Sequence, residues 1–240
     1  MNTQSKNPSV DNRSEIATGI LKRFGQVASA LVFQGIILFL SAGSLNWLWA
    51  WIFLGIYLVS VLINSVFLMR TSPETVAERG QPKEMKRWDM IVSGIWALTQ
   101  YLFLPLVAGL DYRFHWILML SSWNIIGAAI FAIGLGIFSW AMITNTYFST
   151  AVRIQNDRGQ TVCRSGPYHF VRHPGYVGAM LQSLGIPILL GSLWALIPGV
   201  IAVTAMIVRT DMEDHTLQAE LTGYKEFAQE IRYRLVPGIW

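Results

Sequence analysis

The chain has 240 residues, of which 53% are hydrophobic and 13% are charged. Because soluble domains carry about a quarter charged residues, this composition and a mean hydropathy of +0.43 exclude an ordinary soluble domain. The formal net charge of +4 follows from Lys and Arg placed by membrane topology, and it does not indicate nucleic acid as a partner.

The first 23 residues are polar, and the first fifteen are rich in Asn, Ser and charge. We therefore expect residues 1–23 to form a flexible segment on the cytosolic side of a membrane. We expect no cleavable signal peptide, because the first apolar run is too long for the hydrophobic part of one.

Charge-free stretches follow that approach or exceed the ~20 residues needed to cross a bilayer. They comprise residues 24–43, 45–69, 90–110 and 116–143. A fifth stretch, 175–208, is long enough for two short helices, and Pro187, Gly191 and Ser192 near its middle favour a turn. The predicted fold is therefore an all-α, polytopic membrane bundle of about six helices: four spans within residues 24–143 and a C-terminal helical hairpin.

Two further features bear on how these helices pack. Small residues at Gly127, Ala128, Gly134 and Gly136 suit the fourth helix to close contact inside the bundle. The charged segment 70–89 is broken by two prolines, and it is predicted to be a solvated loop.

The orientation in the membrane follows from the basic residues. Alternating spans place 17 of the 18 Lys and Arg residues on one side and leave only Arg113 on the other. The N-terminus, the long loops and the C-terminus are thus expected to face the cytoplasm. With no targeting signal, a prokaryotic inner membrane is the expected location.

Residues 166–178 read Gly-Pro-Tyr-His-Phe-Val-Arg-His-Pro-Gly-Tyr-Val-Gly and lead directly into apolar sequence. Arg172 offers a planar fork for a carboxylate or phosphate, and His173 can donate or accept a proton near neutral pH. Tyr168 and Tyr176 offer aromatic faces to an adenine ring or a sulfonium. The alternative is a basic anchor with interfacial tyrosines, but the density of these groups favours a site.

A second polar cluster, 209–214, follows the hairpin. If the hairpin folds back on itself, Glu213 returns to the membrane face that carries His173. A carboxylate there could bind the ribose hydroxyls or the ammonium group of a nucleotide-like cofactor; the alternative is a solvated helix face. Between the fourth span and the first cluster, residues 151–155 alternate and 156–159 form a turn, which predicts extended loop structure. After the second cluster, the tail is expected to continue as a helix up to Pro237.

Several kinds of site are not indicated. The four histidines lack the spacing of paired metal ligands, so no metal is expected. No Gly-rich strand-to-helix loop is present, which argues against a conventional nucleotide-binding domain. Cys163 is the only cysteine; it cannot form an intramolecular disulfide, and it has no recognisable activating base.

Two boxes with the intervening hairpin resemble the isoprenylcysteine carboxyl methyltransferase family over residues 145–240. The boxes read Arg172-His173-Pro174-Gly175-Tyr176-Val177-Gly178 and Glu213-Asp214-x-x-Leu217 … Gly223-Tyr224 … Pro237. The resemblance implies an integral-membrane enzyme that uses S-adenosylmethionine in a cytosolic pocket built by residues 144–240. It also implies a lipophilic methyl acceptor that enters from the bilayer. Asp214 stands where the family has a second Glu, and Gln160 stands where prenylcysteine enzymes carry a histidine.

The resemblance also implies roles for individual residues. The residues implied to contact the cofactor or shape its pocket are Gln155, Val162, Tyr168, His173, Tyr176, Gly178 and Glu213. Arg172 and Glu213 are the candidate catalytic residues, and Arg172 with Arg232 and Arg234 could orient an acceptor carboxylate. Because a carboxylate is already anionic at neutral pH, we expect positioning residues and no dedicated nucleophile.

Other readings stay open. Phospholipid or thiol methylation is not separable from carboxyl methylation by sequence. NADPH-dependent sterol-reductase-like enzymes share an Arg-His-x-x-Tyr-x-Gly box, although Gly175 and Ala179 differ from their usual residues. A membrane protein that binds a lipid or a partner without catalysis is a further alternative.

Overall fold

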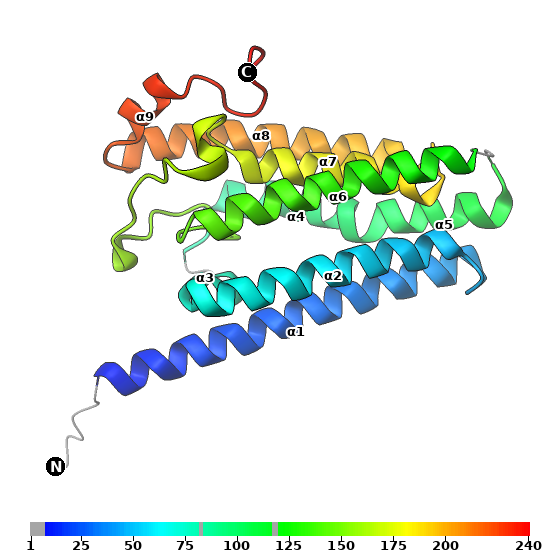
Figure 1. Cartoon of the computed structure of the whole chain (residues 1–240), viewed down its shortest axis with the longest axis horizontal. Coiled ribbons are helices and arrows are strands. Elements are labelled where there is room, and N and C mark those ends of the chain that lie inside the picture. Colours follow the sequence, from blue (N-terminus) through cyan, green and yellow to red (C-terminus); the bar gives the residue numbers. More distant parts are fainter. Residues whose placement is uncertain (1–7, 82–83, 117–119) are drawn as a thin grey trace.

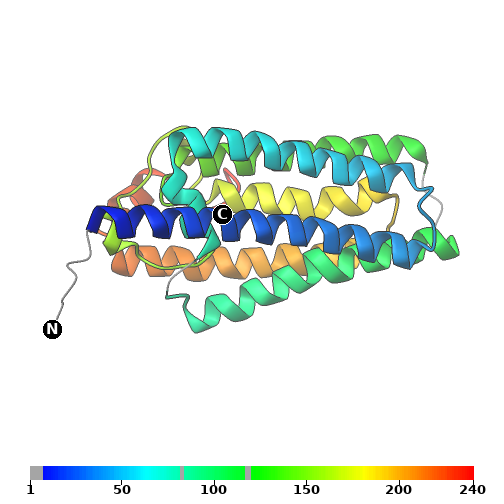
Figure 2. The same cartoon turned by 90° about the horizontal axis from the view of Figure 1, so that it is seen from below.

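The structure is a computed structural model that describes residues 8–81, 84–116 and 120–240. Every regular element in these ranges is helical, and the long helices run roughly along one axis in both views (Figures 1 and 2). The long helices are α1 (Pro8–Ala42), α2 (Leu48–Thr71), α4 (Arg87–Leu98), α5 (Leu104–Phe114), α6 (Ser121–Thr144), α7 (Pro174–Leu190) and α8 (Leu196–Glu220). The short ones are α3 (Pro73–Gly80) and α9 (Tyr224–Glu230).

Within the described residues, four helices are long and apolar enough to cross a membrane. They cover Arg13–Ala42, Leu48–Thr71, Arg87–Phe114 and Ser121–Thr144. Many large apolar side chains point outward from them, as lipid contact requires. The predicted polytopic helical membrane bundle is confirmed, including the hairpin of α7 and α8 that turns at Gly191.

The third span contains a π-helical turn, Thr99–Phe103, between α4 and α5. Pro105 follows at the start of α5, lacks a backbone N–H and would crowd the carbonyl four residues back in a regular helix. The wider turn accommodates this proline. Gln100, within this turn, contacts α7: the Ser183 hydroxyl donates to Gln100 Oε1 at 2.8 Å.

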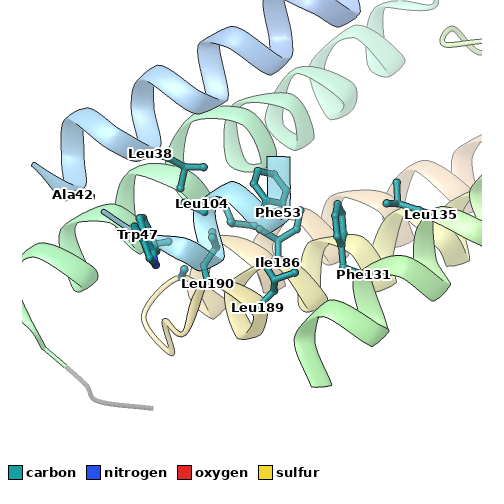
Figure 3. Close-up of a cluster of buried hydrophobic side chains, with 13 residues drawn as sticks. Leu38, Ala42, Trp47, Phe53, Leu104, Phe131, Leu135, Ile186, Leu189 and Leu190 are labelled. Atoms are coloured by element: carbon teal, nitrogen blue, oxygen red, sulfur yellow. The ribbon is translucent and has the colours of Figure 1, made fainter. Parts of the chain in front are cut away.

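The apolar core lies in the half of the bundle nearest the α7–α8 turn. Its largest fully buried members come from five different helices, and Figure 3 shows them meeting around Phe53 and Ile186. Trp47, at the turn before α2, closes this core and stacks on Tyr112 with 4.5 Å between ring centroids. The opposite half of the bundle is more polar.

Helices α6 and α7 approach closely because both carry glycines at the contact. A Cβ added at Gly127 would lie 2.1 Å from the Leu189 backbone N, and one at Gly134 would lie 2.8 Å from the Gly178 carbonyl oxygen. Such pairs of small residues allow helices to pack backbone to backbone in a membrane. The predicted packing role is thus confirmed at these two glycines, whereas a Cβ at Gly136 would meet nothing within 4 Å.

We expect Gly127→Ala to destabilise the protein by about 1–3 kcal/mol, because the added methyl group must push α7 away. Gly136→Ala, on the same helix, should be neutral or stabilise by up to about 1 kcal/mol through helix propensity. Thermal unfolding of both variants in detergent checks this pair. Equal shifts of the unfolding temperature would contradict the close contact.

The predicted flexible segment 1–23 is wrong from residue 8 onward, and residues 1–7 lie outside the described part. Helix α1 begins at Pro8 and extends ahead of its membrane span. It is held there by α3, since a Cβ at Gly19 would come within 2.7 Å of the Ala77 carbonyl oxygen. Polar composition suggested a loose segment, but this contact with a helix distant in sequence stabilises it.

The predicted solvated loop 70–89 is also wrong over much of its length, because it contains the buried helix α3. Glu78 pairs with Arg153 through two hydrogen bonds of 3.0 Å, and both side chains are buried. The Thr75 hydroxyl donates to the Thr146 carbonyl at 2.6 Å. Partners supplied from the 145–163 segment make burial of this charged sequence favourable.

The tail is not one continuous helix as predicted. Helix α8 ends at Glu220, Gly223 takes a left-handed conformation with φ of 82°, and α9 follows. After α9 the chain folds back, so that Arg172 N donates to the Tyr233 carbonyl at 2.9 Å and His173 N to the Arg234 carbonyl at 3.0 Å. The C-terminal segment therefore lies against the first sequence box.

Candidate active site

A polar chamber lies at one end of the bundle. The elements at this end include α3, α9 and the start of α1 (Figure 1). Its walls come from the 145–163 segment, the start of α7, the last turns of α8, and α9. It encloses about 840 Å³ of empty space, counted out to its mouth. The chamber brings the two sequence boxes together, although more than thirty residues of hairpin separate them.

His173 and Tyr176 form one aromatic wall of the chamber. Pro174 occupies the first turn of α7, where proline is favoured, so His173 caps the helix and Tyr176 follows one turn later. Their rings stack with 5.8 Å between centroids and 13° between planes. The Tyr176 hydroxyl donates to the Glu213 carboxylate, which reaches the chamber from α8.

Asp214, next to Glu213, is fully buried and joins four segments of the site. It accepts two hydrogen bonds from Arg172 (2.7 and 2.9 Å), one from Arg234 (2.9 Å) and one from the Tyr224 hydroxyl (3.1 Å). His173 Nε2 lies 3.2 Å from the same carboxylate. Burial alone would raise the pKa of Asp214, but these donors hold the pKa well below its usual range.

All three guanidinium nitrogens of Arg172 donate hydrogen bonds within the protein. Besides its two bonds to Asp214, its guanidinium donates to the carbonyls of Ile231 (2.7 Å) and Arg232 (2.8 Å). Its guanidinium therefore has no free pair of N–H donors for an acceptor carboxylate, in contrast to the role the resemblance implies. We assign Arg172 a positioning role: it fixes the C-terminal segment over His173.

A second buried ion pair holds part of the chamber wall in place. Arg209 donates to Asp89 at 2.7 Å, and Asp89 also accepts from the Val152 backbone N at 2.7 Å. The Arg209 guanidinium lies 5.4 Å from the centroid of the Tyr176 ring. This pair ties α4, α8 and the 145–163 segment together and fixes the ring beside Glu213.

The 145–163 segment forms the remaining wall through its own hydrogen bonds. The side chain of Gln155 is buried. Its Nε2 donates to the Tyr147 carbonyl at 2.7 Å, and its Oε1 accepts from the Arg158 guanidinium at 2.6 Å. Gln160 accepts from the Gln155 backbone N at 2.7 Å, so it closes the turn. As predicted, this segment is extended with a turn at 156–159.

Tyr168 lies at the apolar side of the chamber with Leu217, Leu221 and Phe227. Its hydroxyl accepts from Asn145 Nδ2 at 3.2 Å. Burial raises the pKa of Tyr168 well above its usual range, so the ring stays neutral.

The chamber is lined by most of the predicted site residues. Those that line it are Gln155, Val162, Tyr168, Arg172, His173, Tyr176 and Glu213. Gly178 does not: it faces α6, where a Cβ would lie 2.6 Å from the Gly134 carbonyl oxygen. Arg232 is exposed, and Arg234 is held by Asp211 (3.1 Å) and Asp214. None of these three residues lines the chamber.

Sequence reasoning missed the residues that organise the site, above all Asp214, Tyr224, Asp89 and Arg209. One signal was available, because acids directly beyond a membrane helix need partners, and each acid of 211–214 has one. Across the described residues, His, Cys, Asp and Glu do not gather in threes at any possible metal site.

The fold and the chamber define a polytopic helical membrane protein with a polar site at one end of the bundle. Residues 125–219 match the family described as "Isoprenylcysteine carboxyl methyltransferase (ICMT) family". Over these residues, less than half of the chain, the protein is similar to that family, which confirms the resemblance for the first box and the start of the second. The match covers most of α6, the 145–163 segment, α7 and most of α8, but not α9. No curated protein matches the chain.

Proposed function

We propose that the chain transfers a methyl group from S-adenosylmethionine to a lipophilic acceptor that enters from the bilayer. The observation that carries this proposal is the chamber, where Glu213 and the His173–Tyr176 stack face one cavity. The catalytic part is residues 144–240.

The residues present fit this cofactor. The Glu213 carboxylate suits its ammonium group or ribose hydroxyls. The faces of Tyr176 and His173 suit an adenine ring or a sulfonium. When bound, the cofactor supplies an electrophilic methyl carbon on a positively charged sulfur.

The chain contributes positioning more than covalent chemistry. Glu213 is held by Tyr176, and the tail is held over His173 by Arg172, so both sides of the chamber are fixed in advance. Such orientation of two reactants can lower a barrier by ~7–11 kcal/mol. Since Asp214 and the Tyr224 hydroxyl already surround His173 Nε2, that nitrogen serves to organise the site.

The acceptor class follows from the membrane setting. A carboxylate on an isoprenylcysteine-like lipid is one candidate, and phospholipid or thiol acceptors are others. A carboxylate would need no base, in agreement with a chamber whose ionisable groups are already engaged. Membrane lipids surround the bundle and would deliver the acceptor.

We infer that the chamber end faces the cytoplasm, with both termini on that side. Of the 18 basic residues, Arg113 at the end of α5 is the one that the predicted topology assigns to the opposite end. A prokaryotic inner membrane fits this arrangement.

Calorimetric titration of the detergent-purified protein with S-adenosylmethionine, S-adenosylhomocysteine and NADPH tests the proposal. We expect both adenosyl ligands to bind and NADPH not to bind. Binding of NADPH alone would favour the reductase-like alternative. A folded sample that binds none of the three would remove the support for a cofactor chamber.

A further inference from the structure

A second cavity lies beside the chamber, among α1, α2, α4 and α6, and encloses about 1240 Å³ of empty space counted out to its mouth. Its lining is mostly apolar and includes Phe24, which is 40% exposed, so it reaches the outer surface of the bundle beside α1. Its charged lining residues are Arg23 and Arg79, and none of the described residues that line it is an acid. The cavity thus combines an apolar body with positive charge.

Arg79 is the unusual residue of this cavity, because it is a buried cation that pairs with no acid among the described residues. It is only 7% exposed, and it forms no ion pair or hydrogen bond with any described residue. Its guanidinium lies 5.2 Å from the centroid of Phe148 and 5.7 Å from that of Phe138. Burial and the neighbouring charge of Arg23 lower the pKa of Arg79 to about 9. A buried charge of this kind is costly unless an anion compensates it.

Two residues that line the same cavity each carry a buried polar atom without a partner in the described chain. These atoms are Trp96 Nε1, a donor, and Asn64 Oδ1, an acceptor. The Asn64 amide nitrogen, by contrast, donates to the Ser139 hydroxyl at 2.8 Å. Unpaired polar atoms inside a membrane bundle usually mark a ligand or water site. Three residues with an unpaired polar group therefore line one cavity.

Phe148 separates this cavity from the chamber. Its ring lies against Arg79 on one side, and on the other it lines the chamber next to Gly175, where a Cβ would lie 2.7 Å from the ring. The cation end of the cavity is therefore the end nearest the chamber, and the cavity extends away from it between α2 and α6.

From this arrangement we propose that the cavity binds a single-chain amphiphile from the bilayer, with its anionic head group beside Arg79 and its chain between α2 and α6. Charge complementarity selects the head, since Arg23 and Arg79 face no acid there. The apolar lining selects the chain. The site stands whether or not the chamber transfers methyl groups.

The test is calorimetric titration of the full chain, purified in a neutral detergent and without cofactor, with oleate and with oleyl alcohol. These probes share one chain and differ in head-group charge. We expect oleate to bind at least about tenfold more tightly than the alcohol, as one charge-assisted contact implies. Arg79→Gln should abolish this preference and leave alcohol binding unchanged.

Two further variants keep the test decisive. Arg70→Gln removes an exposed arginine at the same end that does not line the cavity, and it should keep the preference for oleate. Val61→Phe narrows the cavity without changing its charge, and it should weaken binding of both probes. Equal binding of the two probes by the unmodified chain, or an unchanged preference in Arg79→Gln, would overturn the proposal. So would unchanged binding of both probes by Val61→Phe.

Discussion

Replacing Asp214 with asparagine is expected to lower the free energy of unfolding by about 3–5 kcal/mol. Asparagine keeps the shape of the side chain, but it leaves Arg172 buried without a counterion and weakens the hold on Arg234. The loss is large because Asp214 is fully buried and water cannot replace the missing charge. Unfolding of the purified protein in a titration with a denaturing detergent measures it.

The matched control is Asp211→Asn, one turn earlier on α8. Asp211 also pairs with Arg234, at 3.1 Å, but its side chain is 46% exposed. Exposed pairs contribute only about 0–1 kcal/mol, so this variant should unfold close to the unmodified chain. Limited proteolysis adds a second measure: in Asp214→Asn the tail after α9 should become cleavable. A tail that stays protected would show that Asp214 does not hold it.

The membrane part of the fold was predictable because it depends on local properties of the sequence. A charge-free run long enough to span a bilayer has few alternatives to a helix, since its backbone groups must be satisfied internally. The turn at Gly191 was predictable for a similar reason, because glycine takes the left-handed conformation there without strain.

The elements that were mispredicted depend on partners far away in the sequence. Helix α3 is charged and short, and it looks like a solvated loop until Arg153, 75 residues later, compensates Glu78. The first turns of α1 look loose until α3 packs against Gly19. Polarity alone therefore could not distinguish a solvated segment from one that pairs at the membrane surface.

The candidate site was predicted in its position but not in its organisation. The composition and spacing of the two boxes indicated His173, Tyr176 and Glu213 as site residues. The same composition could not show that Arg172 is consumed by a carboxylate 42 residues later and by tail carbonyls. A charged residue in a motif can therefore hold the parts of a site together, as Arg172 does, and need not contact a ligand.

Replacing Glu213 with glutamine is expected to weaken binding of S-adenosylhomocysteine by about 30- to 150-fold, or about 2–3 kcal/mol. Glutamine can still accept the Tyr176 hydroxyl, so the chamber should keep its shape. What it loses is the negative charge proposed to meet the ammonium group or ribose hydroxyls. Calorimetric titration gives the affinity, and the unfolding temperature should stay unchanged.

Glu220→Gln provides the matched control, because Glu220 is an exposed residue of the same helix whose partner is Lys86 at the surface. It removes the same charge from the same helix, outside the chamber. Long-range electrostatics would weaken the ligand in both variants to a similar extent, particularly at low salt. A local contact would weaken it only in Glu213→Gln. Equal affinities of the two variants would therefore remove Glu213 from the ligand contacts and leave the aromatic wall to carry recognition.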